Sequence, residues 1–426
     1  MSHAGLVCQE WVEDHAYECQ NFGSKNTEAL RHVFLSLGDL FLSLQVCSPP
    51  STMWSRAVAT FGCGAARAFS SGSQHGGVCA KLASRRVIQV SGPDASKFLQ
   101  GLVTNDVTLL HPNREPLQYT YFLNHKGRAI CDSFIWCQEE HDADGLSYVL
   151  DCRDDATKLL LRVLKMYRLK SKVDIVDKSE EATVWSIFPE QVRTAFPSDL
   201  LLEEAYHQNF HADPRSTFLG YRKVLFNNDV FQPTTLEGTP FKKVEESQYD
   251  RNRRFQGVLE GLEMSGQIPL ECNLDSLNGV NFNKGCYVGQ ELTARTHFKG
   301  LVRKRCYPVY FASFESDSKI GRRRTAEEVI VGPPSDRVPF VAPAGSSTVS
   351  LREKISGTKA GKLILFNGNG GTTGMALLRV DQVMDEKCRF VGSDSDGKEV
   401  EVCPFVPSWV KPNALAQQAA KESRLL

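Results

Sequence analysis

One cysteine lies in a short stretch whose residue types could support covalent or metal chemistry. The segment FNKGCYVGQELTARTHFKG, residues 282–300, places Cys286 between a Lys-Gly pair and a Gly-Gln-Glu run. Gly285 and Gly289 permit unusual backbone angles and the close approach of a ligand. The residues after Gly289 predict the start of a helix, and the free amides there, with Lys284 nearby, favour a thiolate. We therefore expect Cys286 to be reactive or to bind a metal, while a buried thiol at a tight turn is the alternative.

Other polar side chains near this segment could bind a ligand. Gln290, Glu291 and Arg295 offer hydrogen bonds to a heterocycle or a carboxylate. Glu271 interrupts the apolar run IPLECNL, and a buried carboxylate needs a partner, such as a donor-rich ring system of the pterin type. An exposed edge position would explain Glu271 equally well. Asp132, in a predicted strand, could act as a general base or take part in an ion pair.

Motifs that are missing exclude several classes of site. The thirteen cysteines form no Cys-x-x-Cys pair, and the ten histidines include no His-Glu-x-x-His motif. We therefore expect free thiols in a reducing compartment rather than a dedicated mononuclear metal site or a disulfide framework. Neither Gly-x-Gly-x-x-Gly nor a Walker-type sequence occurs, so the sequence does not predict a phosphate cradle for a nucleotide.

Length and composition are those of an ordinary globular protein. The 426 residues are enough for two domains with extensions. With 50 basic and 50 acidic residues the chain has no formal net charge, so its overall charge favours neither nucleic acid nor a membrane surface as a partner. The apolar patch FLSLGDLFLSL is short and is interrupted by Asp39, so we expect no membrane span.

The N-terminal region has the composition of a mitochondrial transit peptide. No Asp or Glu occurs in residues 40–93, while Arg56 and Arg67 lie among Ala, Ser and apolar residues. We expect the precursor to start at Met53 and residues 1–77 to be an N-terminal extension that contains the transit peptide. A disordered lead-in of low complexity is the alternative.

The order of the predicted elements indicates an α+β protein. Residues 118–136 predict a hairpin that turns at 124–127, and residues 154–169 have the apolar spacing of a helix. Strands and helices alternate irregularly, which favours an α+β domain over a regular doubly wound sheet. The predicted boundaries are 78–300 for this domain, 301–410 for a C-terminal β-barrel with a long loop at 313–347, and 411–426 for a tail.

The cysteine segment resembles the signature of a known family. NKGCYVGQELTAR is similar to the Lys-Gly-Cys-aromatic-x-Gly-Gln-Glu signature of the YgfZ-type proteins, which are folate-binding relatives of the glycine-cleavage aminomethyltransferase. GPDASKFLQGLVTNDV, FLNHKGRAICD, IPLECNL and GMALLRV follow in the family's order, so the resemblance extends from Val87 to Val383. The transit-like segment favours the mitochondrial branch, whose members are iron–sulfur cluster assembly factors.

The resemblance implies an aminomethyltransferase-like fold, a pseudo-threefold α+β ring with a small C-terminal β-barrel. It implies tetrahydrofolate as a cofactor, A-type iron–sulfur carrier proteins as partners, and a location in the mitochondrial matrix. The implied role is the maturation of [4Fe–4S] proteins such as aconitase, lipoate synthase and respiratory-chain subunits. The residues expected to line the folate pocket or its opening are Asn105, Asn124, Glu271, Lys284, Gly285, Tyr287, Gly289, Gln290, Glu291 and Arg295.

Two departures from the aminomethyltransferase pattern affect the expected chemistry. Cys131 and Asp132 stand where those enzymes usually have paired acids, and Cys286 supplies a thiol that their matching segment lacks. The exchange argues against glycine cleavage and for redox or cluster chemistry, with Cys286 and Asp132 as the candidate catalytic residues. One thiolate cannot hold a cluster alone, so Cys286 would be a transient ligand of an iron–sulfur cluster shared with a partner. The rivals are a folate-dependent one-carbon (aminomethyl) transferase that depends on Asp132, and a non-catalytic binding module.

Overall fold

The computed structural model describes eleven parts of the chain. They are residues 77–139, 146–190, 209–226, 241–298, 300–313, 329, 337–343, 346, 348–366, 371–385 and 387–407. The predicted transit segment therefore lies outside the described residues except for Gly77, as do the predicted tail and most of the predicted loop at 313–347. No helix among the described residues is both long and apolar enough to cross a membrane.

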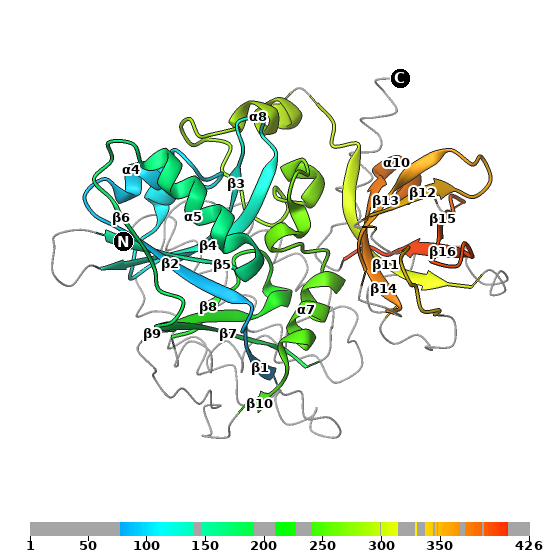
Figure 1. Cartoon of the computed structure of the whole chain (residues 1–426), viewed down its shortest axis with the longest axis horizontal. Coiled ribbons are helices and arrows are strands. Elements are labelled where there is room, and N and C mark those ends of the chain that lie inside the picture. Colours follow the sequence, from blue (N-terminus) through cyan, green and yellow to red (C-terminus); the bar gives the residue numbers. More distant parts are fainter. Residues whose placement is uncertain are drawn as a thin grey trace, which may run out of the picture. The chain divides into compact units, whose positions relative to one another are not determined.

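The first sheet has the strand order β3-β4-β5-β2-β6 and carries helices on one face. The predicted hairpin is confirmed as β3 (Leu117–Leu123) paired with β4 (Ala129–Glu139). The remaining strands are β2 (Arg85–Ser91), β5 (Leu146–Arg153) and β6 (Asp174–Asp177). Helices α4 (Ala95–Gln100) and α5 (Asp154–Arg168) bury their apolar sides in one core with this sheet (Figure 1).

Helix α5 forms where both its spacing and its charges favour it. Leu160, Val163 and Leu164 recur at helical spacing and are buried. Acidic residues occupy the first turn and basic residues the last, in the sense that the helix dipole favours. The helix ends at Arg168, and the next residue, Leu169, has a positive φ of 45°.

The second sheet packs against the other face of the first. Its order is β10-β1-β7-β9-β8, and Val87, Trp136 and Val149 of the first sheet share an apolar cluster with Val184 and Phe188 of the second. Its strands are β1 (Gly77–Lys81), β7 (Ala182–Pro189), β8 (His211–Ala212), β9 (Tyr221–Phe226) and β10 (Lys242–Lys243).

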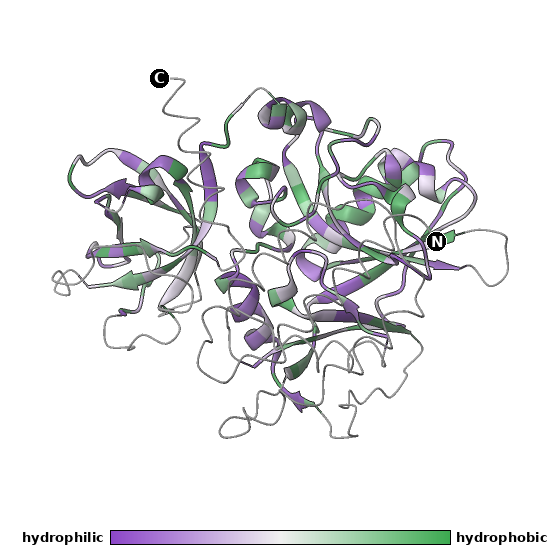
Figure 2. Ribbon diagram, turned by 180° about the vertical axis from the view of Figure 1, so that it is seen from behind, coloured by the Kyte–Doolittle hydropathy of each residue, from purple (hydrophilic) through white to green (hydrophobic). Residues whose placement is uncertain are grey.

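Short helices connect these sheets to the rest of the domain. Helix α7 (Glu246–Phe255) is largely hydrophilic (Figure 2), yet it buries Tyr249 and Arg253. The other short helices are η1 (Val107–Leu109), η2 (Thr217–Leu219), η3 (Gly261–Met264), η4 (Pro269–Cys272) and α8 (Gln290–Phe298). The cysteine segment therefore leads into α8, as the sequence predicts.

The C-terminal strands close into a barrel, which confirms the predicted fold class of α+β with a β-barrel. The barrel order is β11-β14-β13-β12-β15-β16. Its elements are β11 (Lys304–Ala312), β12 (Val349–Glu353), β13 (Lys359–Phe366), β14 (Thr373–Arg379), α10 (Val380–Met384), β15 (Phe390–Ser393) and β16 (Glu399–Pro404). Arg305 of β11 forms an ion pair with Asp275 at 2.8 Å and donates to the Leu270 carbonyl at 3.1 Å, which joins the barrel to the segment around η4.

Candidate functional site

Cys286 lies on an exposed loop, hereafter the signature loop (residues 282–289), immediately before α8. Nine cysteines fall within the described residues; seven are buried, Cys388 is half-buried, and Cys286 is exposed. Burial raises the pKa of the Cys272 thiol to about 12 and that of Cys306 well above its ordinary value. Thiolate formation is therefore disfavoured at these interior cysteines, and the chemistry of a soft ligand or nucleophile falls to Cys286.

Cys286 has no companion ligands in the described part of the chain. Among those residues no three His, Cys, Asp or Glu side chains are grouped closely enough to hold a metal ion. Iron–sulfur clusters are ordinarily held by several thiolates. Any cluster at Cys286 would therefore need its remaining ligands from another molecule.

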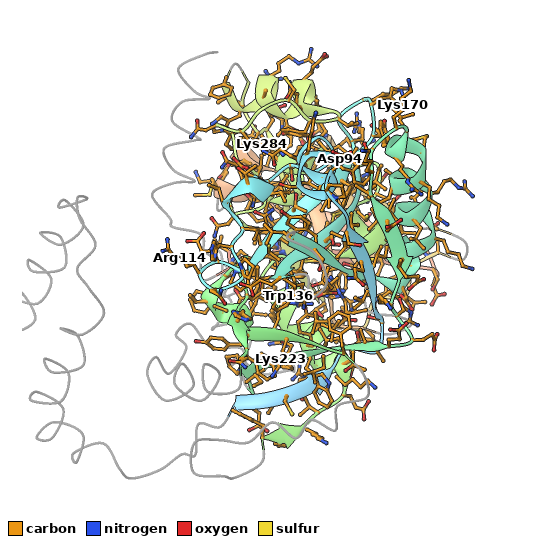
Figure 3. The ribbon with its side chains drawn as sticks, turned by 90° about the vertical axis from the view of Figure 1, so that its left-hand side faces the viewer. Asp94, Arg114, Trp136, Lys170, Lys223 and Lys284 are labelled. Atoms are coloured by element: carbon orange, nitrogen blue, oxygen red, sulfur yellow. The ribbon has the colours of Figure 1, made fainter. Side chains whose placement is uncertain are left out.

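Lys284 anchors the signature loop to the segment that follows α4. Its Nζ donates to the carbonyl oxygens of Gln100, Val103 and Asn105 at 2.8, 2.7 and 2.8 Å. An ammonium has three N–H donors, so all of them are used by backbone. Burial lowers the pKa of Lys284 to about 8. Lys284 therefore positions the loop, and its predicted contact with a cofactor stays a prediction; Figure 3 shows where it lies.

Two glycines let the signature loop and the β3–β4 turn meet backbone to backbone. Gly289 has a φ of 79°, and a Cβ there would come within 2.5 Å of the Asn124 carbonyl oxygen. Gly127 has a φ of 73°, and a Cβ there would come within 2.6 Å of the Leu292 Cβ and 2.7 Å of the Gly289 oxygen. Only glycine combines an easily adopted positive φ with the absence of a Cβ that would clash. Gly285, by contrast, has open space around it, and its expected role in the close approach of a ligand stays a prediction.

Several residues expected to bind a cofactor instead hold the backbone. Asn105 Nδ2 donates to the carbonyls of Tyr119 and Asn278, each at 2.9 Å. Asn124 Oδ1 accepts from the amides of two residues in the β3–β4 turn at 2.9 and 3.1 Å. Gln290 Oε1 accepts from the Tyr287 amide at 3.1 Å, which fixes the loop against the start of α8. These bonds stabilise the site, and the predicted ligand contacts of the three residues stay predictions.

The remaining predicted residues lie around the same loop. Tyr287 is half-buried, and its ring centroid lies 5.0 Å from Lys284 Nζ. Glu291 and Arg295 are exposed on α8. Glu271, on η4, is half-buried, and burial raises its pKa despite the opposing field of nearby lysines and an arginine.

Asp132 lies inside the protein beside an arginine, which fits the ion-pair alternative, and its catalytic role stays a prediction. Its side chain has no exposed surface, and Oδ1 accepts from the Gly261 amide at 2.6 Å. Oδ2 has no hydrogen-bond partner, and the Arg85 guanidinium is 4.0 Å away. Burial raises the pKa of Asp132 to about 6 in spite of Arg85. A general base must come within hydrogen-bond reach of the proton it removes, and Asp132 has no accessible side.

Asp132 borders a cluster of buried ions that we call the charged core. Arg85 Nε donates to Asp151 at 2.5 Å and its Nη1 to Glu260 at 3.1 Å. Arg215 pairs with Glu260 at 2.6 Å, and Arg222 with Asp151 at 2.8 Å. The other members are Asp213, Tyr249, Arg253 and Glu263. Although burial opposes ionisation, Arg85 and its fellow guanidiniums hold the pKa of Glu260 well below its ordinary value.

The charged core was missed by the sequence reasoning. Arg85 and Arg222 lie in strands, where a charged residue ordinarily indicates a solvent-facing position. Arg215 and Arg222 lie over the Phe134 ring, 4.6 and 3.8 Å from its centroid, so the protein's own cations cover that aromatic face. Arg215 also pairs with nearby Asp213, but the bonds of Arg85 and Arg222 to Asp151 and Glu260 join distant parts of the chain and have no local signal.

Comparisons with known proteins agree on both sequence and fold. No protein-family profile matches the chain. The chain is 36% identical over 275 residues to "Iron-sulfur cluster assembly factor IBA57 homolog, mitochondrial" of Dictyostelium discoideum, covering 59% of this chain and 66% of that protein. It is 32% identical to the Mycosarcoma maydis protein of that name, covering 82% and 89%, and 31% identical to "Iron-sulfur cluster assembly factor IBA57, mitochondrial" of Homo sapiens, covering 78% and 85%.

A solved structure is similar in fold. The glycine cleavage system aminomethyltransferase T of Bartonella henselae matches with a TM-score of 0.53 and 13% identity, covering 79% of this chain and 87% of that one. The predicted aminomethyltransferase-like fold is confirmed by this likeness. At this identity the likeness concerns the fold alone.

Proposed function

Since the chain belongs to the IBA57 family of mitochondrial iron–sulfur cluster assembly factors, we propose that it acts in the mitochondrial matrix in the maturation of [4Fe–4S] proteins, with Cys286 as the thiol that meets the cluster. The observation that carries this proposal is the exposure of Cys286 when every other described cysteine is at least half-buried. The proposed clients are aconitase, lipoate synthase and respiratory-chain subunits.

The cluster is cargo in this proposal, and an A-type carrier protein brings it. Cys286 supplies one soft thiolate, and the carrier supplies the remaining ligands, because the described residues offer no further ones nearby. Sharing the cluster keeps it bound while it is exposed between proteins. A single ligand on this side also allows the cluster to leave when a client offers a complete set.

The structure around the loop supports this role by fixing the position of the thiol. Lys284, two residues before Cys286, ties the loop to three backbone carbonyls. Gly289, three residues after Cys286, packs the loop closely against the backbone of the β3–β4 turn. A ligand that is held in place before binding loses less conformational freedom on binding. The loop therefore presents Cys286 as a preformed single-ligand site.

Tetrahydrofolate, which the fold relationship suggests, would find several polar groups of its predicted site already bonded to backbone. The donors of Lys284 and Asn105 are used by backbone carbonyls, and the oxygens of Asn124 and Gln290 are used by backbone amides. Asp132 has no accessible surface. We assign no folate contact to these residues and derive no step through the cofactor.

The same geometry weighs against the rival one-carbon transferase. That reaction requires an acid or base that reaches the substrate, and the candidate, Asp132, is enclosed by the charged core. A purely structural binding module is the remaining rival. It differs in one outcome, since it predicts that the Cys286 thiol is dispensable.

The test is a rescue of cells depleted of this protein. Wild type, Cys286→Ser and a control, Cys388→Ser, are expressed at equal levels, and aconitase activity and protein lipoylation are measured together. We expect wild type and Cys388→Ser to restore both and Cys286→Ser to restore neither. Full rescue by Cys286→Ser would contradict the role of the thiol. Unchanged aconitase with failed glycine cleavage would favour the transferase.

A further inference from the structure

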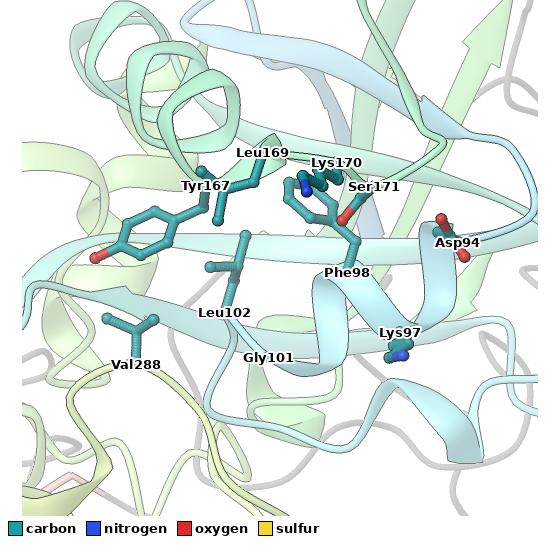
Figure 4. A pocket seen from close by; sticks show the side chains of 10 residues that line it. All are labelled: Asp94, Lys97, Phe98, Gly101, Leu102, Tyr167, Leu169, Lys170, Ser171 and Val288. Carbon is teal, nitrogen blue, oxygen red and sulfur yellow. The ribbon is translucent and has the colours of Figure 1, made fainter.

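A groove opens beside the signature loop, between α4 and the end of α5 (Figure 4). Its cavity volume is about 740 Å³. Phe98, Leu102 and Tyr167 supply apolar surface within it, and Val288 lies at one end. Val288 is two residues from Cys286, and its amide donates to the Gly101 carbonyl at 3.0 Å. The groove therefore reaches the loop that carries the exposed thiol.

The groove is lined by two cations, Lys97 and Lys170, and one acid, Asp94, and it adjoins a basic segment. The segment KLLLRVLKMYRLKSK, residues 158–172, has no Asp or Glu. All its cations are exposed, namely Lys158, Arg162, Lys165, Arg168, Lys170 and Lys172. Lys97, exposed on α4, stands at the far end of the groove (Figure 4). A concentration of one charge on a neutral protein attracts a partner of opposite charge locally.

Two apolar side chains in this basic segment are also exposed to solvent. Met166 is 59% exposed and Leu169 is 86% exposed. Leu169 also has a φ of 45°, which is unfavourable for a branched side chain and ordinary for glycine. Folding therefore gains nothing from leucine at this position. A large apolar residue that is both strained and exposed at the rim of a groove is explained if it meets a partner.

We propose that this groove docks the cluster-loaded carrier through an acidic, partly apolar face next to the carrier's cluster ligands. The inference rests on the proposed function, because it is the shared cluster that brings the carrier to Cys286. A cluster held by thiolates is itself anionic, so its surroundings and the basic rim are complementary in charge. The apolar floor and Leu169 then bury the carrier's apolar residues, while the cations orient the approach.

The experiment titrates a labelled, [2Fe–2S]-loaded A-type carrier protein with full-length variants under anaerobic conditions at low and high salt. The groove variant is Lys165→Glu/Arg168→Glu/Lys170→Glu. The matched control reverses the same number of exposed lysines on the barrel, Lys359→Glu/Lys387→Glu/Lys398→Glu. Leu169→Gly tests the apolar contact without threatening the fold, and Cys286→Ser is followed in parallel by the visible spectrum of the cluster.

We expect the groove variant to weaken association by about tenfold or more, the effect shrinking at high salt, and the barrel variant to stay within about twofold of wild type. Leu169→Gly should weaken association while the protein melts no earlier than wild type. Equal effects of the two charge reversals, or unchanged affinity in Leu169→Gly, would overturn the groove proposal. If, in that case, the cluster spectrum with Cys286→Ser still differed from the spectrum with wild type, the proposed function would stand without the groove.

Two further outcomes would overturn the docking proposal. No association of wild type with the loaded carrier would overturn the proposed function and the groove together. Anionic phospholipid vesicles are the second probe, since a basic rim with bare apolar residues also suits a membrane surface. Loss of vesicle binding in the groove variant, with carrier affinity intact, would overturn the protein-docking proposal in favour of a lipid surface.

Discussion

Replacing Asp132 with asparagine should stabilise the protein at neutral pH, although it removes a charge from an ionic cluster. Burial raises the pKa of Asp132 from 3.8 to about 6, so the protein disfavours its ionised form even with Arg85 at 4.0 Å. One pKa unit corresponds to about 1.4 kcal/mol, so ionising Asp132 costs the folded state about 3 kcal/mol at pH 7. An asparagine can still accept from the Gly261 amide and carries no charge to desolvate.

The pH dependence follows from the direction of this change. A carboxyl group whose folded-state pKa is raised stabilises the protein below its unfolded-state pKa, and that contribution is lost as the pH rises through the folded-state pKa. The stability of Asp132→Asn relative to wild type should therefore grow by about 2 kcal/mol between pH 4.5 and 7. Urea unfolding followed by circular dichroism at several pH values measures this difference.

A matched variant tests whether the surroundings of the aspartate, rather than the Asp→Asn substitution itself, decide whether stability rises or falls. Asp151 is equally buried but pairs with Arg85 at 2.5 Å and with Arg222 at 2.8 Å. Asp151→Asn breaks both pairs and should destabilise the protein by about 3–5 kcal/mol. The reasoning is refuted if Asp132→Asn is destabilised at pH 7, or if it fails in the aconitase rescue although it is folded, because Asp132 would then have a role that its burial does not explain.

Three other predictions concern the loop and the cofactor. Lys284→Met removes three charge-assisted hydrogen bonds of a half-buried group and should lower the free energy of unfolding in urea by about 2–4 kcal/mol. The control Lys126→Met, on the exposed β3–β4 turn, should lower it by less than about 0.5 kcal/mol. Equal losses would contradict the anchoring role. Gly289→Ala combines a positive φ with a 2.5 Å contact to a carbonyl oxygen and should lower stability by about 2 kcal/mol or more, while Gly285→Ala, in open space, should be nearly neutral. Tetrahydrofolate in excess should leave the melting temperature unchanged, and a concentration-dependent rise would show that a folate site exists.

Local patterns in the sequence were sufficient where local forces decide the structure. The β3–β4 hairpin follows from alternating aromatic residues around a Gly-containing turn, and α5 follows from its apolar spacing. The position of Cys286 just before α8 follows from the glycines and polar residues around it, whereas its exposure was left open against a buried thiol. In each case neighbouring residues carry the whole signal.

Long-range contacts could not be read in this way. Lys284 was expected to face a ligand, yet it bonds to carbonyls as much as 184 positions away in the sequence. Asp132 was expected to be a base, because nothing local indicates that Arg85 and Glu260 enclose it. A side chain's type shows which bonds it can make, but only the fold shows which partner it bonds to.

The charged core also bears on how the chain can acquire its structure. Arg85 on β2 finds Glu260 beside η3, 175 positions later, and Asp151 on β5 finds Arg222 on β9, 71 positions later. Each buried charge is costly without its partner. We therefore expect the first half of the domain to be unstable on its own, and a chain that enters a compartment N-terminus first to stay unfolded until η3 has followed. Folding of this domain should be all-or-none, and a fragment ending before residue 260 should remain unfolded.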